Sequence, residues 1–161
     1  MINLSRAKLV LFDFDDTLCI HSNHYNLNAD SYNKAMFTGD TSWWDGNGCE
    51  YSKQMMKLIN YCRDNNIDMG LISAVEFCAT ADVKLGWVKQ KYGVDMKNFC
   101  VSTGEAAKKD MVSYIIRAYC LDANSILFID DYYNHVSQVA SLGVQAASPM
   151  EVVNWANKSN K

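Results

Sequence analysis

The chain has 161 residues, 49% of them hydrophobic, and a formal net charge of −3 at pH 7. This length and composition suit one domain with a substantial hydrophobic core, which we expect to span residues 1–161. The negative charge argues against a strong general affinity for nucleic acid or anionic membranes, without excluding a local basic patch. No apolar stretch reaches the length of a membrane span and no signal peptide is evident, so we expect a cytoplasmic protein that does not associate with membranes.

Strand-like apolar runs and helical periodicities alternate along the chain. The predicted strands are Leu9–Phe14, Ile67–Ile72, Phe99–Val101, Ser125–Ile129 and Gly143–Ala146. The predicted helices are Tyr51–Asn65, Glu76–Tyr92, Lys108–Cys120, His135–Leu142 and Pro149–Asn157. Strands separated by helices predict a three-layer α/β/α, Rossmann-like parallel sheet.

Residues 19–50 show no clear pattern, and Trp43–Gly48 within them is turn-like. We expect this stretch to be a small lid or loop insertion, because it is too short for a large cap domain. Trp43 and Trp44 are more typical of a core or a loop anchor than of a platform that stacks on a ligand.

Polar side chains cluster where the predicted strands end. Asp13, Asp15 and Asp16 lie at the end of the first strand, Ser73 follows the second, and the pair Asp130–Asp131 ends a later one. Clustered carboxylates repel one another and resist desolvation, so a divalent cation is the simplest counter-charge. Ligands of open parallel sheets bind outside the carboxyl ends of the strands, which predicts a site at this edge.

These elements, in this order, resemble the motifs of phosphatases of the haloacid dehalogenase (HAD) superfamily, especially capless or minimally capped members. The DxDxT motif is matched by Asp13–Thr17, the second motif by Ser73, the lysine motif by Lys108 or Lys109, and the acidic pair by Asp130–Asp131. The helical periodicity places Lys108 at the edge of the buried stripe of its helix, which favours it over Lys109.

The resemblance implies a magnesium-dependent phosphomonoester hydrolase that forms an aspartyl-phosphate. It assigns Asp13 as the nucleophile, Asp15 as the general acid and base, and Ser73 and Lys108 as phosphate-binding residues. The implied Mg²⁺ ligands are Asp13, Asp15 through its backbone carbonyl, Asp130 and Asp131. We expect Thr17 to brace the turn through its hydroxyl, and Asn134 to orient Asp131 or to cap the following helix.

Several alternatives stay open. The chain could be a nucleotide or polynucleotide-end phosphatase, a phosphotransferase on the same fold, or a non-catalytic phosphate-binding or regulatory module. The substrate could be a phosphorylated small molecule, a phosphoprotein or a nucleic-acid end, and the sequence does not determine the oligomeric state.

The six cysteines contain no CxxC pair, and without an export signal we expect reduced thiols. Cys19, His21, His24 and Cys49 could in principle ligate zinc. Their spacing fits a substrate lid or a simple surface loop better.

Overall fold

A five-stranded parallel sheet forms the centre of the computed structural model, which describes residues 2–21, 28–104 and 106–158. Its strand order is β6-β4-β1-β8-β9. The bounds are Leu9–Phe12 for β1, Asp68–Leu71 for β4, Lys97–Asn98 for β6, Ile126–Ile129 for β8 and Gln145–Ala147 for β9. Every neighbouring pair of strands in this sheet is parallel, so the predicted α/β fold class is confirmed.

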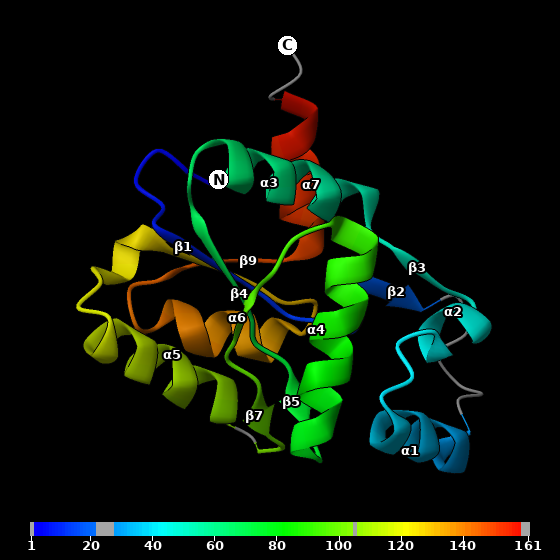
Figure 1. Ribbon diagram of the computed structural model, residues 1–161. Coiled ribbons are helices and arrows are strands. Elements are labelled where there is room, and N and C mark those ends of the chain that lie inside the picture. Colours follow the sequence, from blue (N-terminus) through cyan, green and yellow to red (C-terminus); the bar gives the residue numbers. More distant parts are fainter. Residues whose placement is uncertain (1, 22–27, 105, 159–161) are drawn as a thin grey trace.

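The sheet separates two layers of helices (Figure 1). Val10 and Phe12 of β1 belong to one buried cluster, whereas Leu9 and Leu11 belong to another, because successive strand side chains point to opposite faces. The first cluster includes residues of α3 (Lys53–Asp64), α4 (Cys78–Tyr92) and α7 (Pro149–Lys158). The second includes residues of α5 (Ala107–Ala118) and α6 (Tyr133–Ala140).

The five predicted helices are confirmed, with ends that differ by at most a few residues from the predicted ones. Their boundaries follow local chemistry. The Ser52 side chain caps α3 by accepting a hydrogen bond from the amide of Met55, and Gly93 ends α4 with φ of 69°, a conformation that glycine adopts without strain.

The predicted strand Phe99–Val101 is wrong in its bounds. The structure has two short strands instead, β6 before this segment and β7 (Val101–Ser102) within and after it. The Asn98 side chain accepts a hydrogen bond from the amide of Cys100, a local turn that interrupts the ladder. Strand β7 then pairs with β5 (Ala74–Val75) in a separate two-stranded sheet.

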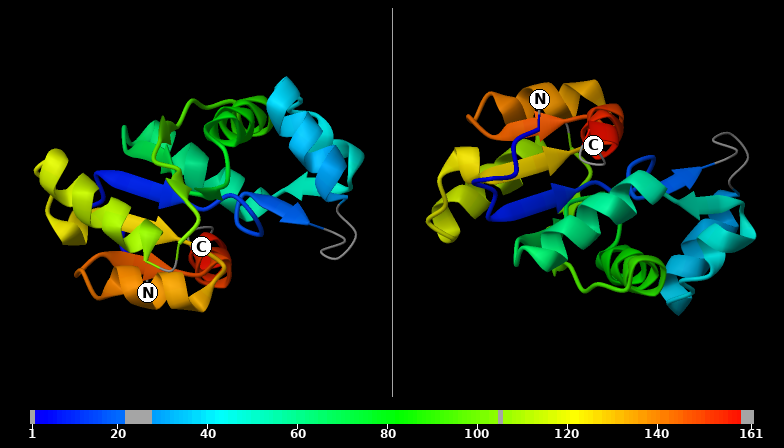
Figure 2. Two further views of the ribbon diagram at one scale, coloured as in Figure 1. Left: turned by 90° about the horizontal axis from the view of Figure 1, so that it is seen from below. Right: turned by 90° about the horizontal axis from the view of Figure 1, so that it is seen from above.

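The segment 19–51 has regular structure that its sequence did not predict. Strand β2 (Cys19–His21) pairs antiparallel with β3 (Cys49–Tyr51), and the chain between them forms α1 (Ala29–Thr38) and α2 (Trp43–Gly46). The turn predicted at Trp43–Gly48 is therefore a single helical turn over most of its length. Figure 2 shows this segment, in light blue to teal, beyond the carboxyl end of β1.

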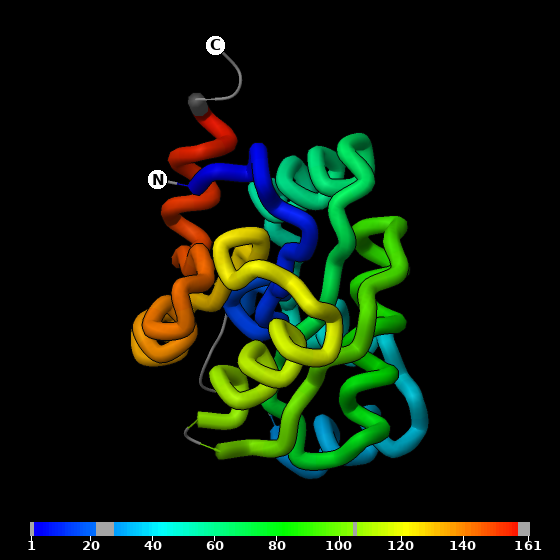
Figure 3. Tube along the Cα trace, turned by 90° about the vertical axis from the view of Figure 1, so that its left-hand side faces the viewer, coloured from blue at the N-terminus to red at the C-terminus, as the bar shows by residue number. Residues whose placement is uncertain are grey.

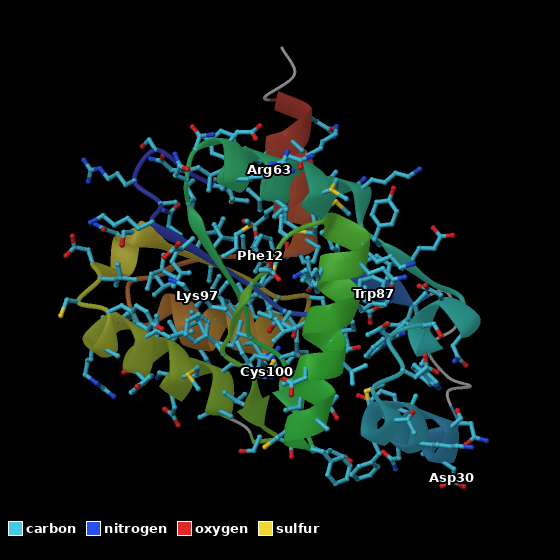
Figure 4. All side chains as sticks on the ribbon, in the orientation of Figure 1. Phe12, Asp30, Arg63, Trp87, Lys97 and Cys100 are labelled. Atoms are coloured by element: carbon cyan, nitrogen blue, oxygen red, sulfur yellow. The ribbon has the colours of Figure 1, made fainter. Side chains whose placement is uncertain are left out.

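An aromatic cluster joins the 19–51 segment to the rest of the molecule. Trp44 meets Phe14 edge-on at a centroid distance of 4.9 Å, and Phe14 meets Trp87 of α4 at 5.4 Å. Trp43 and Trp44 are both buried, which confirms their expected role as core or anchor residues. In Figure 4, Trp87 lies on the side of α4 that faces the 19–51 segment, whereas Asp30 lies at the periphery.

The beginning of the chain lies beside its last helix, as the blue and red parts of the trace show in Figure 3. The Asn3 amide donates to the Gln145 side chain at 3.1 Å, and that side chain donates back to the Asn3 carbonyl at 3.0 Å. Among the described residues, no helix is both long enough and apolar enough to cross a bilayer.

Candidate functional site

The carboxyl ends of the central strands bring the predicted residues together. The backbone amide of Asp13 donates to the carbonyl of Ile129, and that of Ile72 donates to Phe12, both at 2.9 Å. The ladder thus continues one residue beyond β1, which sets Asp13 beside Asp130 at the end of β8. Ser73 lies two residues after the end of β4 and is buried.

The chain turns sharply after Asp13. The carbonyl of Phe14 accepts hydrogen bonds from the amides of Leu18 and Cys19 at 3.0 and 2.9 Å, and Asp16 has φ of 53°. Strand alternation therefore does not place Asp15. The turn directs its carboxylate toward α4 and β2 instead, where its side chain is 49% exposed.

Lys108 lies between two buried carboxylates. Its ammonium donates to Asp13 Oδ1 at 2.7 Å and to Asp130 Oδ2 at 2.6 Å, and its side chain is only 6% exposed. Burial raises the pKa of Asp13 to about 7, because desolvation and the charge of Asp130 together outweigh the attraction of Lys108. Lys109, by contrast, is only partly buried.

Three carboxylates at this edge fit a hard divalent cation. Oxygen atoms of Asp13, Asp130 and Asp131 all lie within 4.8 Å of one another. Lys108 supplies one positive charge against these three acids, which leaves negative charge to be balanced. Oxygen-only ligand sets of this kind suit Mg²⁺. The Asp15 carboxylate lies outside this group, in keeping with the expectation that Asp15 would contact the metal through its backbone carbonyl.

A second buried lysine, which the sequence analysis did not predict as part of the site, contacts two of the predicted site residues. Lys84 Nζ donates to Asp15 Oδ2 at 2.7 Å and to Ser73 Oγ at 2.8 Å, and the lysine side chain is 2% exposed. Its position in the buried stripe of α4, with Ala81, Trp87 and Val88, is the signal that could have revealed it. A lysine in such a stripe needs a buried partner.

Lys84 and His21 both act on Asp15. His21 Nε2 lies 3.0 Å from Asp15 Oδ1. The partial burial of Asp15 would by itself raise its pKa, but the charge of Lys84 and the hydrogen bonds from His21 and Lys84 together hold that pKa well below its usual range. In turn, the hydrogen bond to Asp15 raises the pKa of His21.

The acidic pair has a further neighbour that the motifs did not predict. His135 Nδ1, at the start of α6, lies 3.1 Å from Asp130 Oδ2. Asp130 Oδ1 also accepts the backbone amide of Tyr132 at 2.9 Å. These contacts hold the Asp130 carboxylate in one orientation toward Lys108.

Thr17 and Asn134 do not make the supporting hydrogen bonds that the sequence analysis predicted for them. The Thr17 hydroxyl is buried and has no hydrogen-bond partner among the described residues, so the backbone bonds of Phe14, not this hydroxyl, hold the turn. Asn134 donates to the hydroxyl of Tyr132 at 3.1 Å, and α6 has no side-chain cap. Neither role expected for Asn134 is therefore found.

An aromatic pocket opens beside Asp15. It has a volume of about 310 Å³. The residues that line it come from the turn after Asp13 and from the 19–51 segment. They are Asp15, His21, Ala29, Tyr32, Trp43 and Trp44. Asp15 thus borders a space that can hold part of a ligand.

We expect Lys84→Met to destabilise the protein by about 1–3 kcal/mol, because Asp15 and Ser73 lose their shared donor while Asp15 keeps access to water. Lys89→Met is the matched control on the same helix. Its ammonium pairs with Asp95 at 2.9 Å, but both side chains are largely exposed, so its loss should cost at most about 1 kcal/mol. Urea unfolding of both variants measures the difference, and equal losses would show that the buried contacts of Lys84 contribute nothing special.

Comparison with known proteins now defines the class of fold. The sequence matches no protein-family model and no curated protein. The structure resembles a haloacid dehalogenase-like hydrolase from Streptococcus pneumoniae with a TM-score of 0.57 and 12% identity over 94% of this chain and 99% of that one. It also resembles a HAD-superfamily hydrolase from Ehrlichia chaffeensis, with a TM-score of 0.56 and 11% identity over the whole of both chains.

A third similar structure is a HAD-family enzyme from Bacteroides thetaiotaomicron in complex with magnesium and inorganic phosphate. Its TM-score is 0.50 and its identity 12%, over 88% of this chain and 93% of that one. The resemblance predicted from the motifs is thus confirmed at the level of fold: the chain has the HAD-like fold.

Proposed function

We propose that the chain is a magnesium-dependent phosphomonoester hydrolase that works through an aspartyl-phosphate on Asp13. The observation that carries this proposal is the contact of buried Asp13 with Lys108, beside Asp130 and within reach of Asp131. The HAD-like neighbour that holds magnesium and inorganic phosphate supports it. We further propose that residues 1–161 form one catalytic domain, in which the 19–51 segment is a small insertion.

Asp13, Asp130 and Asp131 would hold the metal ion, together with the backbone carbonyl of Asp15. Mg²⁺, when bound there, supplies positive charge that offsets the carboxylates and the oxygens of an incoming phosphoryl group. Without such compensation, an anionic nucleophile would repel an anionic ester.

In the first step, a carboxylate oxygen of Asp13 would form a bond to phosphorus while the bond from phosphorus to the leaving oxygen breaks. Three side chains would bind the phosphoryl oxygens. The Ser73 hydroxyl would donate a hydrogen bond, and the ammonium groups of Lys108 and Lys84, which already contact Asp13 and Ser73, would add positive charge.

In the second step, water would attack the phosphorus and release inorganic phosphate from Asp13. Asp15, held as a carboxylate by Lys84, suits the removal of a proton from that water. The proton needed by the leaving oxygen in the first step can be held by the His21–Asp15 pair, whose atoms lie 3.0 Å apart.

A panel assay tests this proposal. Purified protein is expected to release inorganic phosphate from an aryl phosphate in the presence of Mg²⁺ and to lose this activity with a chelator. The panel contains nucleotides, sugar phosphates, phosphopeptides and 3′-phosphorylated oligonucleotides. Transfer to an added alcohol instead of water would indicate a phosphotransferase, and phosphate binding without turnover on any member would favour a binding module.

A further inference from the structure

Strands β2 and β3 carry two cysteines that the proposed phosphatase reaction does not use, and both lie near His21, whose other ring nitrogen contacts Asp15. Its register pairs His21 with Cys49, and Cys19 lies two residues before His21 on the same strand. Side chains two residues apart on a strand share a face, and so do directly opposite residues of paired strands. The register therefore sets Cys19, His21 and Cys49 on one face, with Ile20 on the other.

We propose that Cys19, His21 and Cys49 form a binding site for a soft divalent metal ion, for which Zn²⁺ is the best match. The Sγ atoms of both cysteines and a ring nitrogen of His21 lie within 4.8 Å of one another. Cys49 Sγ lies 3.2 Å from His21 Nδ1, close to the separation of about 3.5 Å that a tetrahedral zinc ion imposes on a sulfur and a nitrogen ligand.

The burial and the donor atoms of the three side chains fit a metal site better than ordinary packing in the hydrophobic core. Cys19 is fully buried, Cys49 is 7% exposed and the His21 side chain is 8% exposed. Thiolate and imidazole together are the donor set that zinc prefers, and three protein ligands leave a fourth position for water. His21 also lines the aromatic pocket, so one of the three side chains borders an open space.

The second nitrogen of His21 supports the same assignment. A histidine that ligates a metal usually donates its other N–H to a carboxylate, which fixes the tautomer and the orientation of the ring. His21 Nε2 lies 3.0 Å from Asp15 Oδ1, so a metal at Nδ1 leaves the proton on Nε2, pointing at Asp15. The site shares no ligand with the carboxylate group of Asp13, Asp130 and Asp131.

Metal binding to these thiols should release a number of protons that can be measured. Burial raises the thiol pKa of both Cys19 and Cys49, so both are protonated at neutral pH when no metal is present. Because a metal takes the thiolate form, uptake of one ion should release about two protons. In excess Mg²⁺ the carboxylate group of Asp13, Asp130 and Asp131 is already occupied, so the protons released on zinc uptake come from the thiols.

The test uses the full chain, reduced and freed of metal, in excess Mg²⁺ so that the carboxylate group is occupied. Zn²⁺ is titrated against a chromophoric chelator, and Co²⁺ serves as a spectroscopic probe. We expect one Zn²⁺ per chain, release of about two protons, and a cobalt spectrum with thiolate charge-transfer bands and tetrahedral d–d bands. Cys49→Ala and His21→Asn should each weaken zinc binding by at least about 100-fold.

Cys120→Ser is the control, because Cys120 is an exposed thiol outside the hairpin and its loss should leave zinc binding unchanged. The proposal is overturned if wild-type protein takes up no Zn²⁺, or if Cys49→Ala binds it as tightly as wild type. A Cys19–Cys49 disulfide together with no uptake after reduction also overturns it. The cobalt spectrum of wild type decides the matter even if a variant fails to fold, and none of these readouts needs phosphatase activity.

Discussion

Replacing Asp13 by asparagine is expected to lower the magnesium-dependent turnover of an aryl phosphate by about 10⁴-fold or more, which is typical of the loss of a nucleophile. The asparagine amide has nearly the same shape but cannot form the acyl phosphate. It also removes one of the two carboxylates that contact Lys108. Phosphate release at saturating substrate measures this effect, and Asp13→Ala serves as a second variant that cannot revert by deamidation.

Asp16→Asn is the matched control for this prediction. Asp16 lies three residues further along the same motif, its carboxylate accepts the backbone amide of His21, and its φ of 53° suits asparagine as well as aspartate. We expect this variant to keep nearly full activity. Turnover that depends on Mg²⁺ and survives Asp13→Asn would contradict the assignment of the nucleophile, whereas equal losses in both variants would indicate a general effect on the turn.

Replacing Lys108 by methionine is expected to destabilise the metal-free protein by about 3–5 kcal/mol, because it leaves two buried carboxylates facing each other without a cation. Burial already raises the pKa of Asp13 to about 7. Below that pH the folded protein holds Asp13 protonated and needs the lysine less, so the loss should be smaller at pH 5 than at pH 8. Urea unfolding with a chelator present measures both values.

Two comparisons make the Lys108 prediction specific. Lys109→Met, one residue further along α5 and only partly buried, should change the free energy of unfolding by no more than about 0.5 kcal/mol. Mg²⁺ should raise the melting temperature of Lys108→Met more than that of wild type, because the ion then supplies the missing positive charge. Equal destabilisation by the two methionine variants would contradict the placement of Lys108 between Asp13 and Asp130.

The part of the site that lies at strand ends could be predicted from the sequence. Asp13, Ser73 and Asp130 each follow a buried strand, and parallel strands bring their carboxyl ends to one edge. The helical stripe of α5 was enough to favour Lys108 over its neighbour. These predictions needed only local patterns and one general property of parallel sheets.

The contacts of Asp15 could not be predicted in this way. Lys84 lies 69 residues from Asp15 in sequence, and no local pattern shows which partner a buried lysine will meet. The turn after Asp13 also removes the strand alternation that would have oriented Asp15. In the same way, the hairpin that groups Cys19, His21 and Cys49 became visible only through its register, since its strands are three residues long.

Phe14 stands between Asp13 and Asp15 in the chain, and its ring packs against both Trp44 of the insertion and Trp87 of α4. The spacing of the two carboxylates therefore depends on how the 19–51 segment packs against the fully buried ring of Phe14. An insertion at this place cannot be exchanged between relatives like a surface loop. We expect that a graft which tailors the pocket to a new substrate needs a matching tryptophan to keep the contact with Phe14.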